Sequence, residues 1–448
     1  MKIQERDIIR LIDEKKLAEL KGYLSEMNPV DLADIIDDLD NKNSLIVIRL
    51  LPKELGVEVF SYFDVDKQKE IATMISDSEL KYILDQLYFD DMIDLLEEMP
   101  AELVADILKN APYSQRKLIN EFLKYPEDSA GSIMTIEYVD LKEEMTVEDA
   151  IDHIRDIGMT KETVYTCYVT NASAKLVGIV SLRKLVTEDT SKRIGDIMQT
   201  DIITVNTHDD QEEVAEVFKK YDFLAIPVVD KEYRLTGIIT VDDIMDVIEE
   251  EATEDFQKMA AMEPTDDDYL DTPVLKLAKH RITWLLILMI SGTFTGAIIR
   301  GYEDVLSKMT VLSMFIPMLM DTGGNAGSQS STLIIRGLAV GDIQMKDIFK
   351  VLRKETMIAI LVGIALSFVN FLRLILIERI DSKIALVVSI TLVFTVLMAK
   401  LVGGMLPIFA KKLKLDPAIM AGPLITTLVD AGSLMIYFKF STILLGLR

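Results

Sequence analysis

One acid stands inside a long apolar stretch near the end of the chain. Residues 421–438 read AGPLITTLVDAGSLMIYF, and Asp430 is the only charged side chain among them. A central Asp in a membrane helix costs about 2.5–3.5 kcal/mol, and intramembrane acids usually line a pathway or a polar cavity. Thr426, Thr427 and Ser433 lie within about a turn and are the expected polar neighbours. We interpret Asp430 as a pathway residue rather than a buried helix residue bonded to a neighbour.

A second polar stretch, PMLMDTGGNAGSQSSTLIIRG, occupies residues 317–337. Its small residues permit close helix packing, but so many polar groups at membrane depth are tolerated only where they line water or protein. Carboxylate, amide and carbonyl oxygens favour hard cations such as Mg²⁺, Ca²⁺ or Mn²⁺. Mg²⁺ keeps its water shell, and a two-fold axis would place two copies of Asp430 face to face around a hydrated ion.

Five apolar segments are expected to position these residues as membrane helices: 282–299, 309–335, 356–372, 384–399 and 417–438. A spanning helix needs about 20 apolar residues. Basic residues flank the first, second and fourth segments on one side, which predicts a cytoplasmic N-terminus and an external C-terminus. Trp284 and Tyr437 are candidate interface anchors. Lys400 lies within the fourth segment, where it either snorkels, pairs with an acid or faces the pathway.

The charge balance indicates an acidic soluble part joined to this apolar part. There are 73 acids and 48 bases, a formal charge of −25, yet half of the residues are hydrophobic. Such a surface repels phosphates, so nucleic acid is not an expected partner. The single Cys167 rules out an internal disulfide and suits a reducing compartment. The first residues, MKIQERDIIR, lack the apolar core of a signal peptide, so we expect this end to stay in the cytoplasm.

Two regions make up the soluble part. Residues 1–128 show apolar positions at helical spacing, as in DLADIIDDL and DDMIDLLEEM, and predict an all-α, superhelical domain. Residues 129–250 alternate β-rich and helical runs and repeat themselves, since GIVSLRKL (178–185) matches GIITVDDI (237–244). The openings SIMT and DIMQT recur as well. This duplicated α/β unit resembles a tandem CBS pair.

An acidic segment, 241–275, joins the repeat to the membrane part, and we expect it to form a long linking helix that transmits force. Its first 31 residues contain thirteen acids and one base, Lys258. The membrane domain then occupies residues 276–448.

The order of these parts resembles the MgtE family of magnesium channels over essentially the whole chain. The GGNAG-x-Q-S stretch and the LVDAG of the last span are similar to that family's signatures. The resemblance implies a homodimer in the inner or plasma membrane that conducts Mg²⁺, with no enzymatic activity. It implies a pore built from the second and fifth spans, in which Asp430 is the selectivity carboxylate and Asn325, Gly324 and Thr426 lie nearby.

The resemblance also implies that cytosolic Mg²⁺ binds the acidic surfaces and closes the pore through the linking ("plug") helix. The matching positions are Glu58, Asp90, Asp94, Asp210, Glu212, Asp222, Asp243, Asp246, Glu251, Glu254, Asp255 and Asp416. Facing acidic surfaces repel, and bridging divalent ions make them attract, so Mg²⁺ biases a two-state element.

ATP is the second ligand that a CBS pair suggests. CBS pairs often place an acid three residues after the Ser or Thr of the closing motif. Thr240 and Asp243 keep this pattern, but in the first copy Ser181 is followed by Lys184. The lysine removes an expected ribose-binding carboxylate and argues against ATP regulation.

Two rival functions fit the sequence less well. Asp321-Thr322-Gly323 spells the DTG of aspartic proteases and would pair with Asp430, but a pepsin-type DTG belongs on a β-loop, and the G-x-G-D of intramembrane proteases is absent from the sequence. A CBS-gated anion channel is disfavoured by an acid in the pathway and by the lack of an intramembrane arginine cluster.

Overall fold

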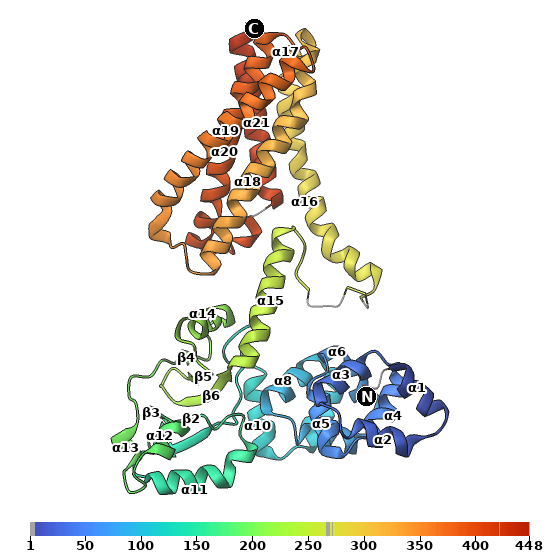
Figure 1. The fold of residues 1–448 in the computed structure, drawn as a ribbon, viewed down its shortest axis with the longest axis vertical. Coiled ribbons are helices and arrows are strands. Elements are labelled where there is room, and N and C mark those ends of the chain that lie inside the picture. Colours follow the sequence, from blue (N-terminus) through green and yellow to red (C-terminus); the bar gives the residue numbers. More distant parts are fainter. Residues whose placement is uncertain (1–4, 266–268, 271, 421, 448) are drawn as a thin grey trace. The chain divides into compact units, whose positions relative to one another are not determined.

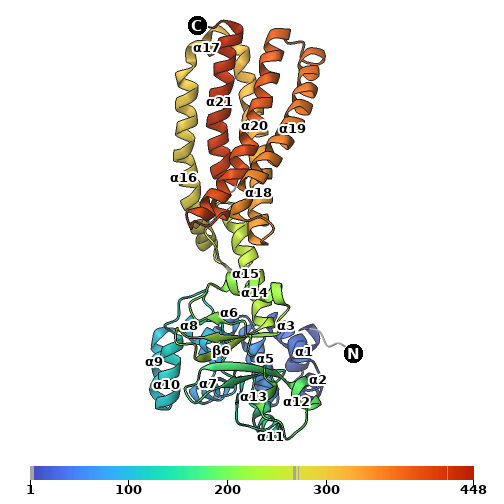
Figure 2. The same ribbon diagram turned by 90° about the vertical axis from the view of Figure 1, so that its left-hand side faces the viewer.

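The computed structural model describes residues 5–265, 269–270, 272–420 and 422–447. It divides into two compact units, Met1–Val247 and Ile248–Arg448. Figures 1 and 2 show the first unit in blue to green and the second in yellow-green to red.

The first unit begins with ten short helices, as the apolar spacing predicts. Side chains at the N-caps satisfy free backbone N–H groups: Asn28 caps the third helix and Asp40 the fourth, and Ser76 forms a capping box with Glu79. Most of these helices bury apolar residues against their neighbours, and α9 has only partly buried ones among its described residues. The helices are α1 (Glu5–Asp13), α2 (Leu17–Leu24), α3 (Pro29–Asp37), α4 (Asn41–Leu50), α5 (Lys53–Ser61), α6 (Val65–Met74), α7 (Asp77–Leu84), α8 (Phe89–Glu98), α9 (Ala101–Asn110) and α10 (Tyr113–Phe122).

Two three-stranded sheets follow, with the same topology in each copy of the repeat. The first strand is parallel to the second, and the second is antiparallel to the third. The strands are β1 (Val139–Lys142), β2 (Thr166–Thr170), β3 (Leu176–Ser181), β4 (Val205–Asn206), β5 (Ala225–Val229) and β6 (Leu235–Thr240). The helices are α11 (Val147–Ile157), η1 (Gly158–Thr160), α12 (Leu182–Thr187), α13 (Ile194–Ile197) and α14 (Gln211–Tyr221).

The repeated motifs interlock the two copies. A Cβ at Gly237 would lie 2.9 Å from Sδ of Met134, which opens the first copy. A Cβ at Gly178 would overlap Met198, which opens the second copy. Each opening segment therefore packs on the last strand of the other copy. A side chain at Gly178 would overlap Met198, and one at Gly237 would lie 2.6 Å from the carbonyl oxygen of Thr135, so both positions favour glycine.

The linking helix is shorter than the segment predicted for it. It is α15 (Val241–Met259), and the described residues between Met259 and Val274 form turns and coil. Residues 266–268 and 271 of the predicted segment lie outside the described residues.

The second unit contains the long apolar helices. They are α16 (Val274–Gly301), α18 (Ile316–Ala339), α19 (Ile348–Leu376), α20 (Ser382–Lys412) and α21 (Gly422–Leu445), with the short elements α17 (Glu303–Lys308), η2 (Thr310–Phe315), η3 (Met345–Asp347) and η4 (Ala418–Met420) between them. Within the described residues, four helical stretches are long and apolar enough to cross a membrane, 274–301, 345–376, 382–412 and 418–445. The polar helix α18 is the fifth predicted span and stays a prediction.

Helix α18 packs against both α20 and α21, and α19 packs against α20. Glycines bring the helices together: a Cβ at Gly403 of α20 would overlap the carbonyl oxygen of Gly327 on α18, and one at Gly432 of α21 would overlap Met398. The prediction that Tyr437 anchors the membrane interface is wrong. Its ring is fully buried, and its hydroxyl donates to the Leu312 carbonyl oxygen at 2.8 Å, so the ring belongs to the core.

Candidate functional site

Helix α18 presents two different faces. Asp321, Asn325 and Gln329 recur every four residues and are exposed, so they form one stripe along the helix. Asn325 Nδ2 donates to Asp321 Oδ1 at 3.1 Å. The opposite face is buried and carries the glycines and Ser330. The dense polar run therefore separates into a packing face and an open polar face.

Asp430 lies half-buried on α21, which packs against α18. Asp321 is the charged side chain that interacts with it electrostatically. The Asp430 carboxylate accepts no hydrogen bond from the residues that the structure describes. Asp321 and Asn325 of α18 and Asp430 of α21 thus form an oxygen-rich set, and such a set suits a hard cation.

The expected polar neighbours of Asp430 have other roles. Thr426 and Thr427 both donate through Oγ1 to the Pro423 carbonyl oxygen at 2.9 Å, because helical threonines readily bond the preceding turn. Ser433 is fully buried against the packing face of α18. A Cβ at Gly324 would lie 3.1 Å from Thr426 Cγ2, so both residues serve as the contact between α18 and α21. Both threonine hydroxyls thus donate within their own helix, and their role beside Asp430 stays a prediction.

An acid cluster forms in the first unit where α8 faces the beginning of α15. We call it the Asp91 cluster, and its members interact electrostatically with one another: Asp90, Asp91, Glu137, Glu162, Asp242 and Asp243. The structure thus brings together Asp90 and Asp243, two of the predicted cation ligands.

Burial is the main cause of the raised pKa values in this cluster, and the neighbouring acids add to it. The pKa of Asp91 rises to about 6 and that of Glu162 to about 7. The pKa of Asp243 rises to about 6 despite hydrogen bonds from Thr240. The pKa of Asp90 rises well above its ordinary value. When they are ionised at neutral pH, these half-buried carboxylates repel one another.

Two oxygens of the cluster have unused bonding capacity. Asp90 Oδ1 and Glu162 Oε2 are shielded from solvent and accept no hydrogen bond from the described residues. Within that same part of the chain, no three acidic, histidine or cysteine side chains converge to hold a metal directly. Carboxylate oxygens such as these two can accept hydrogen bonds from the water shell that Mg²⁺ keeps.

A second acid cluster surrounds Lys258 at the end of α15. Lys258 Nζ lies 2.5 Å from Glu254 Oε1 and 2.7 Å from Asp416 Oδ2, in the connector before α21. Burial and the Asp416 charge raise the pKa of Asp255. We call these four residues the Lys258 cluster. Three predicted ligands thus meet around the only base of the linking segment.

Most of the remaining predicted ligands lie outside these two clusters. Asp210 and Glu212 stand at the start of α14, where the Asp210 side chain accepts from the Glu212 N–H at 2.9 Å. Asp222 ends the same 11-residue helix, about 16 Å away at 1.5 Å per residue. The three cannot bind one ion within a single chain. Of the others, Glu58 lies on α5, Asp94 on α8, and Asp246 and Glu251 on α15. Asp246 adjoins the Asp91 cluster, because its charge helps to raise the pKa of Asp243.

The two copies of the CBS repeat differ at the predicted nucleotide site. In the second copy Asp243 accepts from Thr240 Oγ1 at 2.5 Å and from the Thr240 N–H at 3.2 Å. In the first copy Ser181 Oγ accepts from the Lys184 N–H, and Lys184 Nζ pairs with Glu188 at 3.3 Å. Lys184 thus leaves the first copy without the carboxylate that the second copy has.

Sequence reasoning missed several of these residues. Asp321 and Gln329 could have been found from their spacing with Asn325. Asp91 and Glu162 had no signal of their own, because each is one acid among many. Lys258 was visible as the only base in its segment, and its partner Asp416 lies 158 residues further along the chain.

Sequence profiles match the helical N-terminal region, the repeat and most of the membrane region. A profile described as "Divalent cation transporter" matches residues 316–440. The "MgtE intracellular N domain" matches 27–128, and the CBS domain matches 130–190 and 194–250. The fold and these matches define a multi-pass membrane transport protein with a helical N-terminal domain and a CBS pair.

Similar proteins narrow this class to a family. The chain is 38% identical over 432 residues to the magnesium transporter MgtE of Thermus thermophilus, and the match covers 95% of each chain. It is 34% identical to MgtE of Bacillus subtilis, with 97% of this chain and 96% of that one covered. The solved cytosolic domain of the Mg²⁺ channel MgtE in complex with ATP matches 54% of this chain and 99% of that one, with 36% identity and a TM-score of 0.52. The chain belongs to the MgtE family of magnesium transporters.

Proposed function

We propose that the chain forms a homodimeric, Mg²⁺-selective channel or transporter with a pore built from α18 and α21. The open polar face carries this proposal: Asp321 and Asn325 stand unpacked beside Asp430 among otherwise apolar helices. A two-fold related copy would cover that face with an identical set. The four carboxylates of the dimer would then surround a hydrated Mg²⁺, with Asp430 as the selectivity carboxylate.

The proposed orientation follows from the basic flanks of the membrane helices. Lys276, Lys279 and Arg281 precede the uncharged apolar part of α16, and Lys411 and Lys412 end α20. With five spans, α16 and α18 to α21, these ends share the cytoplasmic side. The N-terminus then lies in the cytoplasm and the C-terminus outside, in the inner or plasma membrane, and the partners are the lipid bilayer, divalent cations and a second copy.

The second part of the proposal is that cytosolic Mg²⁺ closes this pore. The Asp91 cluster is the observation that supports it. Two like charges 4 Å apart at an effective dielectric of about 20 repel by roughly 4 kcal/mol. A bound Mg²⁺ replaces the repulsion between α8 and α15 by attraction, so it favours the compact arrangement of acids seen here. The Lys258 cluster joins the other end of α15 to the connector before α21 by ion pairs, so that α15 can pass the change to the membrane helices.

ATP is a ligand of the solved relative, and we expect it to bind this chain weakly or not at all. The reason is Lys184, whose ammonium pairs with Glu188 where an acid is expected.

Divalent cation flux into liposomes tests the pore. The purified full-length protein is expected to admit Mg²⁺ in preference to Ca²⁺, and Asp430→Ala is expected to lose the flux or the preference. Asp304→Ala is the matched control, because Asp304 is exposed on α17. Unchanged flux and unchanged preference in Asp430→Ala would refute the selectivity role.

Limited proteolysis of α15 tests the closure. Millimolar Mg²⁺ is expected to protect residues 241–259 from cleavage and to reduce flux together. Equal cleavage with and without Mg²⁺, in protein whose flux ignores cytosolic Mg²⁺, would leave the acids without a gating role.

A further inference from the structure

Two oppositely charged side chains are buried inside the membrane unit, connected by a serine. Lys400 of α20 is 5% exposed, Glu355 of α19 is 6% exposed, and Ser330 of α18 is 1% exposed. Lys400 Nζ donates to Ser330 Oγ at 3.3 Å, and Ser330 Oγ donates to Glu355 Oε2 at 2.6 Å. An ammonium only donates, an ionised carboxylate only accepts, and a hydroxyl does both. The chain of bonds is therefore complete for a charged lysine and an ionised glutamate.

Glycines make room for this chain of bonds. A Cβ at Gly404 would lie 3.0 Å from Glu355 Cγ, so the carboxylate reaches Ser330 past a bare stretch of α20. The adjacent Gly403 touches the backbone of α18 at Gly327. Three helices thus meet at one point, where a buried charge that lost its partner would be strongly destabilising.

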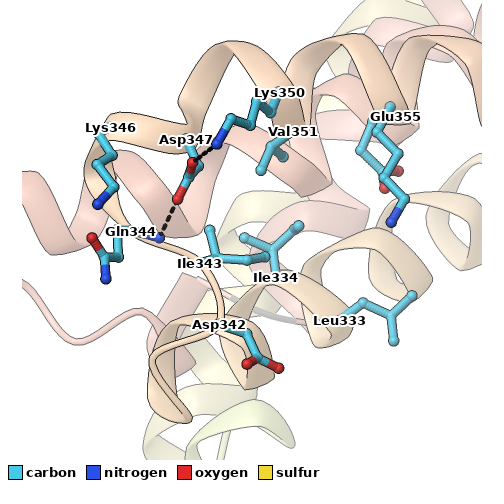
Figure 3. A pocket seen from close by; sticks show the side chains of 11 residues that line it. Leu333, Ile334, Asp342, Ile343, Gln344, Lys346, Asp347, Lys350, Val351 and Glu355 are labelled. Carbon is cyan, nitrogen blue, oxygen red and sulfur yellow. Dashed lines mark hydrogen bonds and ion pairs between the residues drawn. The ribbon is translucent and has the colours of Figure 1, made fainter.

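Glu355 also lines a pocket on the surface of the membrane unit. It lies at one end of a pocket of about 690 Å³ between α18 and α19 (Figure 3). The pocket's Asp347 and Lys350 pair with each other at 2.6 Å, and Figure 3 shows them apart from Glu355.

Ser330 lies on the side of α18 opposite its open polar face. At 100° per residue, it is about 140° from the middle of the Asp321–Asn325–Gln329 stripe. We propose that Lys400 and Glu355 are positioning residues: through Ser330 they fix the rotation of α18 and so hold Asp321 and Asn325 toward Asp430. This inference rests on the proposed pore. Cation selectivity then depends on two side chains that never contact the ion.

Disulfide trapping measures this rotation without relying on transport. An ideal Cβ at Gly324 would lie 3.5 Å from Thr426 Cβ, within the range of disulfides. Full-length protein with Gly324→Cys and Thr426→Cys is reconstituted in liposomes and oxidised with copper phenanthroline. The loss of two free thiols is followed, and the buried Cys167 serves as the internal reference.

Ser330→Ala is expected to slow trapping several-fold. Ser331→Ala is the matched control, because Ser331 is fully buried one residue away and its hydroxyl has no hydrogen-bond partner among the described residues. Equal trapping rates in the two variants would overturn the proposal. In flux assays without the added cysteines, Ser330→Ala is expected to lower the Mg²⁺ to Ca²⁺ ratio several-fold, and this ratio does not depend on the amount of folded protein. An unchanged ratio would overturn the link to selectivity.

The charged residues are tested as a pair, because each single change leaves a buried charge alone. Lys400→Met and Glu355→Gln are each expected to lower the yield of folded protein. The double variant is expected to recover that yield while trapping stays slow. Trapping at the wild-type rate in the double variant would refute the positioning role. If the wild-type protein fails to admit Mg²⁺, the proposed pore is refuted. The comparison of trapping rates would still decide whether Lys400 and Glu355 fix the rotation of α18.

Discussion

The Asp91 cluster predicts an unusual result: removing one of its charges should stabilise the Mg²⁺-free protein. Asp91 is half-buried on α8 and interacts with Asp242, Asp243 and Glu137. Asp91→Asn keeps nearly the same volume and removes the charge. We expect the first unit of this variant to be more stable than the wild type at pH 7.5 in EDTA.

The magnitude follows from the pKa of Asp91, which rises from 3.8 to about 6. A folded state that raises the pKa of an acid favours its protonated form. The associated stability is complete below pH 3.8 and is lost as the pH rises through about 6. About two pKa units correspond to roughly 3 kcal/mol at pH 7.5, as an upper value. For a unit of this size, that is a shift in Tm of roughly 6–12 °C.

Scanning calorimetry of the full-length protein in detergent and EDTA measures this effect. The wild type is expected to melt at a lower temperature at pH 7.5 than at pH 5.5, and added Mg²⁺ should raise its Tm at pH 7.5. Asp91→Asn should melt higher at pH 7.5, depend less on pH and respond less to Mg²⁺. Asp34→Asn is the control, because Asp34 is exposed on α3.

A lower Tm of Asp91→Asn than of the wild type in EDTA at pH 7.5 would refute this reasoning. It would mean that the acids are well solvated or already compensated. An equal rise in Tm in the Asp34 variant would assign the effect to net charge and not to the cluster.

Three further results are expected. Lys258→Met should make protection of α15 from protease depend entirely on Mg²⁺, because the ion pair to Asp416 that joins α15 to the connector is lost; protection that persists in EDTA would contradict this. Gly403→Ala should lower the Tm of the membrane unit, because its methyl would overlap a carbonyl oxygen of α18, whereas Gly292→Ala has open space around it and should not. ATP titrated calorimetrically into the protein should bind weakly or not at all because of Lys184, and saturation at micromolar ATP would contradict that expectation.

Local patterns predicted the elements of this fold well. The helical spacing of residues 1–128 and the repeat of residues 129–250 are confirmed as ten helices and two matching sheets. The glycines of the repeated motif, Gly178 and Gly237, predicted the repeat. They did not predict that the opening segment of each copy packs on the last strand of the other copy. That packing depends on contacts between copies about sixty residues apart, which no local pattern encodes.

The site was predicted less completely. The sequence gives the spacing of residues along a helix or strand, but it does not give the neighbouring helix or strand that those residues face. Asp430 was visible, since an acid in an apolar helix is costly. The bonds of Thr426 to its own helix and the burial of Tyr437 depend on side-chain geometry and on the neighbour of each helix. Asp91 differs from the many other acids only because α8 packs where α15 begins.

The separation of the two compact units has a consequence for biosynthesis. All strands and the ten N-terminal helices lie before Val247, and the first long apolar helix begins at Val274. At about 5–20 residues per second, the ribosome needs roughly 12–50 s to make the first unit, whereas small domains fold in microseconds to seconds. The soluble unit can therefore fold before any membrane helix is available for insertion. Its Asp91 cluster would then form before any membrane helix is made, so the proposed Mg²⁺ sensor would be assembled before the proposed pore.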